Sequence, residues 1–187
     1  MSEVLWRRLI YFLSPQLDIY KHIAPELADK SVIDIGFCTG FGTIQFLPYA
    51  YQVDGLEIDT EAVAFANDNL PGVGWYTGDI GSEDFSHHTQ YDAVVMIEVL
   101  EHIEDWPTAL SNVKQLLKDG GEFYISARNA NADLRKNELH EREWTAKEFS
   151  EALTIYFDEV TLYDYKLENV QDTSTRQTPL VARCKKG

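Results

Sequence analysis

The sequence has little cysteine, few basic residues and no long apolar run. Two cysteines in 187 residues, Cys38 and Cys184, cannot build a disulfide framework, so we expect a reducing, cytoplasmic setting. The apolar run at residues 9–13 is far shorter than a membrane span, and we expect no membrane partner. There are 16 lysines and arginines against 31 acidic residues, a formal net charge of −15. Such a charge repels phosphate backbones, which disfavours nucleic acid as a partner.

The remaining composition is that of one globular domain over residues 1–187, with 44% hydrophobic and 25% charged residues and no repeat. Short β-type runs alternate with amphipathic stretches. Strands are predicted at 31–36, 51–58, 91–97 and 121–127, with a weaker candidate at 73–77. Helices are predicted before Pro25, at 60–70, from Trp106 to a stop at Gly120, and after Thr145.

Two of the helices carry start signals. Asp105 precedes Trp106 and can cap the helix, with Pro107 fitting its first turn. Thr145 is followed three residues later by Glu148, which predicts a capping box.

The order of these elements predicts an α/β fold. Strands that alternate with helices indicate βαβ units and a mainly parallel sheet. The tail differs, because residues 157–165 and 178–184 are two late strands with no helix between them. They predict an antiparallel hairpin at one edge of the sheet, with the polar run 169–177 as its loop.

A glycine-rich segment, DIGFCTGFG at residues 34–42, follows the first strand directly. Its glycines permit a tight turn, and a helix beginning after it would offer free N–H groups to a ligand. An acid that holds ribose hydroxyls is expected about 20 residues further on, and Glu57 stands there. The segment lacks the GxGxxG spacing of a dinucleotide site. A different nucleotide-like cofactor is therefore indicated, and a nicotinamide oxidoreductase is a distant alternative.

Five segments resemble the motifs of the class I S-adenosylmethionine-dependent methyltransferases of small-molecule type. They are VIDIGFCTG, GLEID, GDI at 78–80, YDAVVMIEVLEHIED and LLKDGGEFYIS, in that family's order, and the resemblance runs from about Ser31 to the C-terminus. It implies a Rossmann-like, seven-stranded, mostly parallel sheet with an antiparallel final strand and helices on both faces. It also implies S-adenosylmethionine as the cofactor.

The same resemblance assigns cofactor contacts residue by residue. The methionine end would be lined by Asp34, Gly36, Phe37, Cys38 and Gly40. Glu57 would bind both ribose hydroxyls, and Ile58 would lie against adenine. Asp79 would meet the adenine amino group, with Ile80 beside it, and Ile97 and Glu98 would approach the methionine portion. Cys38 departs from the family, which has glycine there. Its side chain can restrict the approach of the cofactor to the backbone.

A second group of polar residues follows the 91–97 strand. In a helical turn, the i, i+3, i+4 spacing would place Glu98, Glu101 and His102 on one face, with His140 downstream. We predict Glu101, His102 and His140 as candidate catalytic proton acceptors, without a metal. The alternative is a divalent metal held by these carboxylates and imidazoles. That pattern resembles metal-dependent RNA 3′-end 2′-O-methyltransferases and, with three ligands, ubiquinone-pathway O-methyltransferases.

The expected reaction is in-line transfer of a methyl group to an O or N nucleophile of a small molecule. Residues 1–30 are expected to form an N-terminal helical lid and residues 128–144 a substrate-side insertion. Two alternatives stay open. One is a metal-assisted RNA 3′-end 2′-O-methyltransferase, which would be sensitive to chelators. The other is a non-catalytic protein that binds the cofactor weakly or not at all and works through protein contacts. The sequence predicts no oligomeric state.

Overall fold

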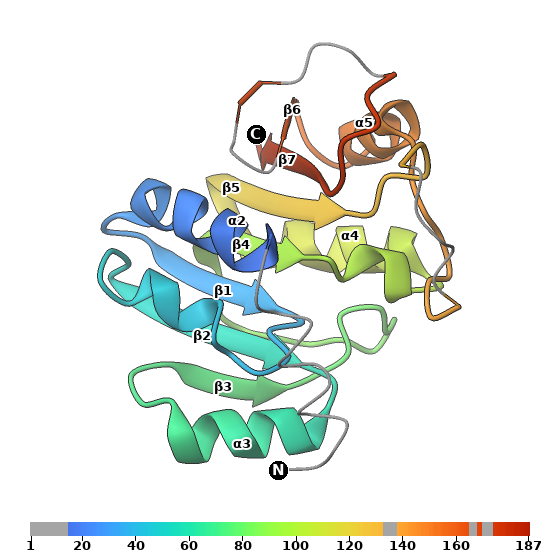
Figure 1. The fold of residues 1–187 in the computed structure, drawn as a ribbon. Helices are drawn as coiled ribbons and strands as arrows, with labels where there is room; N and C mark the ends of the chain where they lie inside the picture. The colour runs from blue at the N-terminus through green and yellow to red at the C-terminus, as the bar shows by residue number, and fades with distance from the viewer. Residues whose placement is uncertain (1–14, 133–137, 165–167, 170–173) are drawn as a thin grey trace.

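The computed structural model describes residues 15–132, 138–164, 168–169 and 174–187, and its described strands form one seven-stranded sheet in the order β3-β2-β1-β4-β5-β7-β6. Figure 1 shows β3 at one edge and the β6–β7 pair at the other. Strands β3, β2, β1, β4 and β5 are parallel, whereas β7 runs antiparallel to both β5 and β6. The predicted Rossmann-like fold with an antiparallel final strand is confirmed.

The predicted strands lie within a few residues of the observed ones. The strands are β1 (Ser31–Ile35), β2 (Gln52–Glu57), β3 (Gly74–Thr77), β4 (Tyr91–Ile97), β5 (Leu117–Ala127), β6 (Glu159–Tyr163) and β7 (Leu180–Lys185). Every residue of β1 is buried, as expected for a central parallel strand covered on both faces. The late hairpin is confirmed by the pairing of β6 with β7.

The helices are α2 (Pro15–Ile23), α3 (Thr60–Asn69), α4 (Trp106–Leu116) and α5 (Ala146–Thr154), with short 3₁₀ turns η1 (Ala24–Leu27), η2 (Thr43–Phe46) and η3 (Leu100–His102). The predicted caps are confirmed. Asp105 accepts a hydrogen bond from the N–H of Thr108, and Thr145 and Glu148 form a capping box. The predicted stop at Gly120 was wrong, because α4 ends at Leu116 and β5 begins at once. Leu117 pairs with Tyr91 of β4, and Gly120 (φ +75°) donates to the carbonyl of Lys186.

The expected helix after the glycine segment was also wrong. Only the four-residue turn η2 forms there. Pro48 explains the difference, since a proline lacks the N–H needed to continue a helix and its ring would clash with the carbonyl of Ile44. The candidate cofactor loop therefore leads into a short turn and has no helix dipole beneath it.

Side chains that alternate along the strands build a separate core on each face of the sheet. Ile33, Ile35 and Met96 pack with residues of α4 and α5 on one face. Residues of α2 pack with Val32 and Val95 on the other. Helix α2 is thus a core layer on this face of the sheet, while residues 1–14 of the expected N-terminal lid lie outside the described residues. None of the helices in the described residues has the length and apolar character needed to cross a bilayer.

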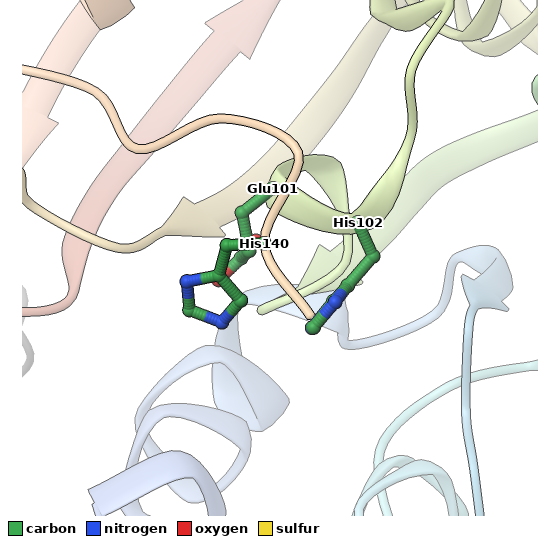
Figure 2. Close-up of side chains that lie close together, drawn as sticks. All are labelled: Glu101, His102 and His140. Carbon is green, nitrogen blue, oxygen red and sulfur yellow. The ribbon is translucent and has the colours of Figure 1, made fainter. Parts of the chain in front are cut away.

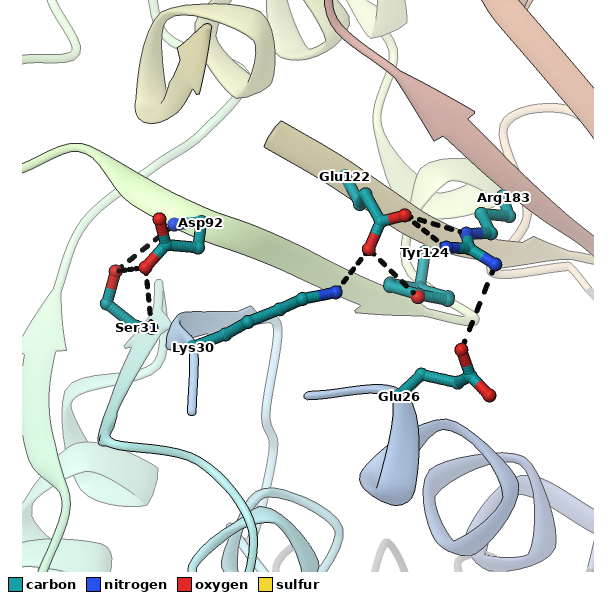
Figure 3. A network of polar contacts seen from close by, with 7 residues as sticks. All are labelled: Glu26, Lys30, Ser31, Asp92, Glu122, Tyr124 and Arg183. Atoms are coloured by element: carbon teal, nitrogen blue, oxygen red, sulfur yellow. Dashed lines mark hydrogen bonds and ion pairs between the residues drawn. The ribbon is translucent and has the colours of Figure 1, made fainter. Parts of the chain in front are cut away.

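A charged network joins three strands near the amino-terminal edge of the parallel sheet. Figure 3 shows Lys30, which precedes β1, and Arg183 of β7 reaching Glu122 of β5 from opposite sides. The Glu122 side chain is only 14% exposed. Its negative charge is therefore paired twice in a largely dry position, which fixes β5 and β7 against the start of β1.

Candidate active site

The glycine segment turns sharply where β1 ends. Gly36 and Gly40 have φ values of +71° and +77°. A Cβ on Gly36 would lie 2.4 Å from a methyl carbon of Val99, which follows β4. Only glycine allows the loop after β1 to pass this closely beneath the loop after β4. Cys38 also has a positive φ, +54°, a conformation that is disfavoured for a residue with a side chain.

The carboxylate of Glu57 joins this loop to the end of β2. Its Oε2 accepts a hydrogen bond from the N–H of Cys38 at 2.9 Å. Its Oε1 accepts from the N–H groups of Ile58 and Asp59 at 2.9 and 3.1 Å. The predicted ribose-binding acid is therefore held in one orientation at the carboxyl edge of the sheet, where ligands of open α/β sheets bind.

Asp34 lies beneath the loop. It is fully buried, and its carboxyl accepts hydrogen bonds from Tyr20 of α2 at 3.1 Å and from Thr43 of η2 at 2.5 Å. Burial raises the pKa of Asp34 to about 7, against the two hydrogen bonds, which lower it. Its side chain thus braces the loop from below, with Tyr20 filling the space beside Gly42.

The loops after β2 and β3 lie side by side, because the N–H of Gly78 donates to the carbonyl of Glu57 at 3.0 Å. Ile58 is 63% exposed, although it is apolar and follows the buried Glu57 directly. Asp79, in the adjacent loop, is exposed and accepts from the N–H of Gly81. An apolar surface and a carboxylate at neighbouring strand ends suit a heterocyclic base with an amino group.

Three apolar residues among the predicted contacts have buried side chains. Phe37 is fully buried, and its ring packs against Trp75 with 4.4 Å between the centroids. Ile80 and Ile97 are 5% and 3% exposed and belong to the two cores. The side chains of these three residues therefore belong to the core packing, and their contact with a cofactor stays a prediction.

The turn after β4 differs from the helical face that the spacing suggested. Glu98 has a φ of +55° and is outside any helix, while Glu101 and His102 lie in η3. Ser126 of β5 explains this: its hydroxyl accepts from the N–H of Glu98 at 3.0 Å and donates to the Glu98 carboxylate at 3.1 Å. Burial raises the pKa of Glu98 to about 7.

Glu101, His102 and His140 lie close together in the structure. One possible ligand atom from each lies within 4.8 Å of the others, and the two rings are 4.8 Å apart. Figure 2 shows Glu101 and His102 on the same turn and His140 on the facing loop. Glu101 is 1% exposed, and neither of its carboxylate oxygens has a hydrogen-bond partner among the described residues.

The electrostatics of this cluster favour the neutral forms of Glu101 and His140. Burial first, and the neighbouring Glu98 second, raise the pKa of Glu101 well above its ordinary value. Ionisation of Glu101 would require a cation or a protonated imidazole beside it. Burial also lowers the pKa of His140, although Glu143 opposes this, so the neutral ring is favoured.

Comparison with known proteins agrees with the fold. The family model described as Methyltransferase domain matches residues 33–125. A Mycolicibacterium smegmatis protein named as a probable S-adenosylmethionine-dependent methyltransferase is 29% identical over 140 residues, 72% of this chain and 54% of that protein. Nodulation protein S of Azorhizobium caulinodans is 32% identical over 105 residues, 53% of this chain and 50% of its own length. This chain spans about half the length of these curated relatives.

The fold is shared with a solved structure that contains the cofactor product. N-methyltransferase NodS from Bradyrhizobium japonicum, in complex with S-adenosyl-L-homocysteine, superimposes with a TM-score of 0.69 at 20% identity, covering 98% of this chain and 97% of that one. The chain belongs to the class I S-adenosylmethionine-dependent methyltransferases. Within this methyltransferase fold, the loops after β1, β2 and β4 converge at one edge.

Two residues that shape this methyltransferase site gave no recognised sequence signal. Asn112 of α4 donates to the carbonyls of Ile80 and Ser82, both at 2.9 Å, and so holds the loop after β3. Glu143 contacts His140, three residues before it. For Asn112, the signal that could have been used is an asparagine among the apolar residues of the α4 face. For Glu143, it is an acid three residues after a candidate histidine.

Proposed function

We propose that this chain binds S-adenosylmethionine at the carboxyl edge of its sheet and transfers the methyl group to an O or N nucleophile of a small molecule. The observation that supports it most is the Glu57 carboxylate, fixed between the glycine loop and the loop after β2. The residues present fit the cofactor. Exposed Ile58 and Asp79 would hold the adenine end, and Glu57 the ribose.

When bound, S-adenosylmethionine supplies an electrophilic sulfonium methyl group, and an in-line attack leaves S-adenosylhomocysteine. The protein's part is to align the two partners and to exclude water. A hydroxyl acceptor must also lose its proton as the new C–O bond forms. The imidazole of His140, beside Glu101, is the proposed proton acceptor, with His102 and Glu101 as the other candidates.

Several relatives support a small acceptor. Ubiquinone biosynthesis O-methyltransferase of Thiobacillus denitrificans is 28% identical over 110 residues, which is 57% of this chain and 47% of that protein. The name NodS denotes an N-methyltransferase. Both acceptor types are thus represented among similar proteins, and the net charge of −15 opposes a long nucleic-acid substrate. The cytoplasmic setting stays a prediction from the cysteine content.

The first test is calorimetric titration of metal-free protein with S-adenosylmethionine and with S-adenosylhomocysteine. We expect a Kd of roughly 1 μM, equivalent to about −8 kcal/mol. Acceptors with amine, phenol and carboxylate groups then follow, with S-adenosylhomocysteine release as the readout. Absence of binding to both ligands at about 1 mM would refute an active enzyme and leave the non-catalytic alternative.

A second candidate function is metal-assisted transfer to the 2′-hydroxyl at an RNA 3′ end. The observation in its favour is the buried Glu101 carboxylate beside two imidazoles. One oxygen and two nitrogen donors suit Zn²⁺ or Mn²⁺ and would leave coordination positions for a substrate oxygen. Titration of Mn²⁺ into the wild type and Glu101→Gln tests the site. Methylation of an RNA 3′ end that stops on adding a chelator would support this function over the first.

A further inference from the structure

Contacts of the two candidate-site histidines assign the proton on each ring. Nδ1 of His102 lies 2.9 Å from the backbone oxygen of Leu139. Nδ1 of His140 lies 3.1 Å from Oε1 of Glu143. A carbonyl oxygen and an ionised carboxylate only accept hydrogen bonds, so Nδ1 of each ring must donate. In the neutral imidazoles the lone pair is therefore on Nε2.

Glu143 is itself held in place. Nε of Arg128, the residue that follows β5, lies 2.8 Å from the same Oε1, and both side chains are about one-fifth exposed. The backbone around Glu143 is fixed as well, because the N–H groups of Glu141 and Arg142 donate to the carbonyl of Glu101 at 2.8 and 3.2 Å. The carboxylate that contacts His140 is thus tied to the sheet through Arg128 and to η3 through its own segment.

We propose that Glu143 is a positioning residue of the methyl-transfer site: it holds His140 as the Nδ1–H tautomer, so that the lone pair of the neutral ring is on Nε2. The proposal rests on the proposed function. A neutral histidine in water favours the opposite, Nε2–H tautomer, which could not accept a proton at Nε2. Loss of the Glu143 carboxylate would therefore put the proton on the wrong nitrogen without removing the ring.

The test is two-bond ¹H–¹⁵N correlation spectroscopy of the histidine rings at about pH 8, without cofactor or acceptor. The five histidines are assigned by single His→Gln variants. We expect the Nδ1–H pattern for His140 in the wild type and in Glu143→Gln, whose amide oxygen still accepts. We expect a shift to Nε2–H in Glu143→Leu. His102 is the internal control, because its acceptor is a backbone oxygen.

Kinetics supply the functional readout. Glu143→Leu should lower kcat about tenfold, with the KM for S-adenosylmethionine within about twofold, and Glu143→Gln should restore most of kcat. An Nε2–H pattern for His140 in the wild type overturns the proposal even if the leucine variant does not fold. An Nδ1–H pattern retained in Glu143→Leu overturns it too. Failure to bind S-adenosylhomocysteine would instead count against the proposed function, because the spectra need no ligand.

Discussion

Oε2 of Glu57 accepts a hydrogen bond from the N–H of Cys38, with 2.9 Å between the two atoms. The contact links the end of β2 to the middle of the glycine loop. Both partners are unusual, since Glu57 is only 8% exposed and Cys38 has a left-handed φ. Glu57, the proposed ribose-binding residue, therefore also holds Cys38 in its strained backbone conformation.

Removal of this carboxylate should weaken cofactor binding. We expect Glu57→Ala to raise the Kd for S-adenosylhomocysteine at least tenfold, about 1.4 kcal/mol, because it removes the ribose partner and frees the Cys38 N–H. Glu61→Ala is the matched control, since Glu61 is an exposed acid in the first turn of α3. Calorimetric titration of both variants measures the effect. Equal affinities would show that Glu57 is not at the cofactor.

Cys38 should be a position where glycine is better. The left-handed conformation costs an L residue roughly 1–2 kcal/mol, part of which glycine loses again through its entropy in the unfolded chain. Cys38→Gly should therefore raise the free energy of unfolding by about 1 kcal/mol and tighten S-adenosylhomocysteine binding. Cys38→Ala keeps the strain and should do neither. Urea denaturation measures the free energy of unfolding, and calorimetric titration measures the affinity for S-adenosylhomocysteine. A gain in stability in Cys38→Ala equal to that in Cys38→Gly would contradict the argument.

The strands, and the edge of the sheet at which the candidate site lies, could be predicted because their sequence signals are local. Each strand is a short apolar run, and parallel strands place the segments after them at one edge. The glycine loop and Glu57 were identified from their places after two such strands. The capping box at Thr145 was identified from its own local signal, the glutamate three residues later. The stop of α4 was missed since Leu117 has a strand partner, Tyr91, that is distant in sequence.

Features set by contacts between distant segments could not be read from the sequence. The turn at Glu98 depends on Ser126, which is 28 residues away. The loop after β3 depends on Asn112, which is about 30 residues away. Spacing alone suggested a helical face for Glu98, Glu101 and His102, but hydrogen bonding to β5 prevails. The pairing of His140 with Glu143 is local, yet only the fold shows that His140 lies close to Glu101.

Asn112 offers a test of the loop after β3 from outside the site. Its amide donates to the carbonyls of Ile80 and Ser82, so Asn112→Ala leaves one buried and one partly buried acceptor without this donor. We expect a loss of about 2 kcal/mol in unfolding free energy and a several-fold weaker affinity for S-adenosylhomocysteine. Asn69→Ala, at an exposed asparagine at the end of α3, should change neither. An unchanged affinity for Asn112→Ala would separate this loop from cofactor binding.

The network around Glu122 should affect stability and leave cofactor binding intact. Burial alone would raise the pKa of Glu122, but hydrogen bonds from Lys30 and Arg183 outweigh it and lower the pKa below its ordinary 4.5. A lowered folded-state pKa means that the native protein binds fewer protons than the unfolded chain. This contribution is therefore complete above about pH 4.5 and is lost as the pH falls through the folded-state pKa.

Glu122→Gln isolates this contribution. At pH 7 we expect it to lower the free energy of unfolding by about 2 kcal/mol, because Lys30 and Arg183 lose a charged acceptor in a site that is mostly dry. The difference in unfolding free energy from the wild type should shrink on going from about pH 5 to about pH 3.5, measured by urea denaturation.

The control is Glu151→Gln, which breaks an exposed pair with Lys147 and should lower the unfolding free energy by less than about 0.5 kcal/mol. The affinity for S-adenosylhomocysteine should stay unchanged in both variants, because Glu122 lies at the sheet edge opposite the site. A Glu122→Gln effect that is independent of pH would show that packing, and not the charge, stabilises this junction.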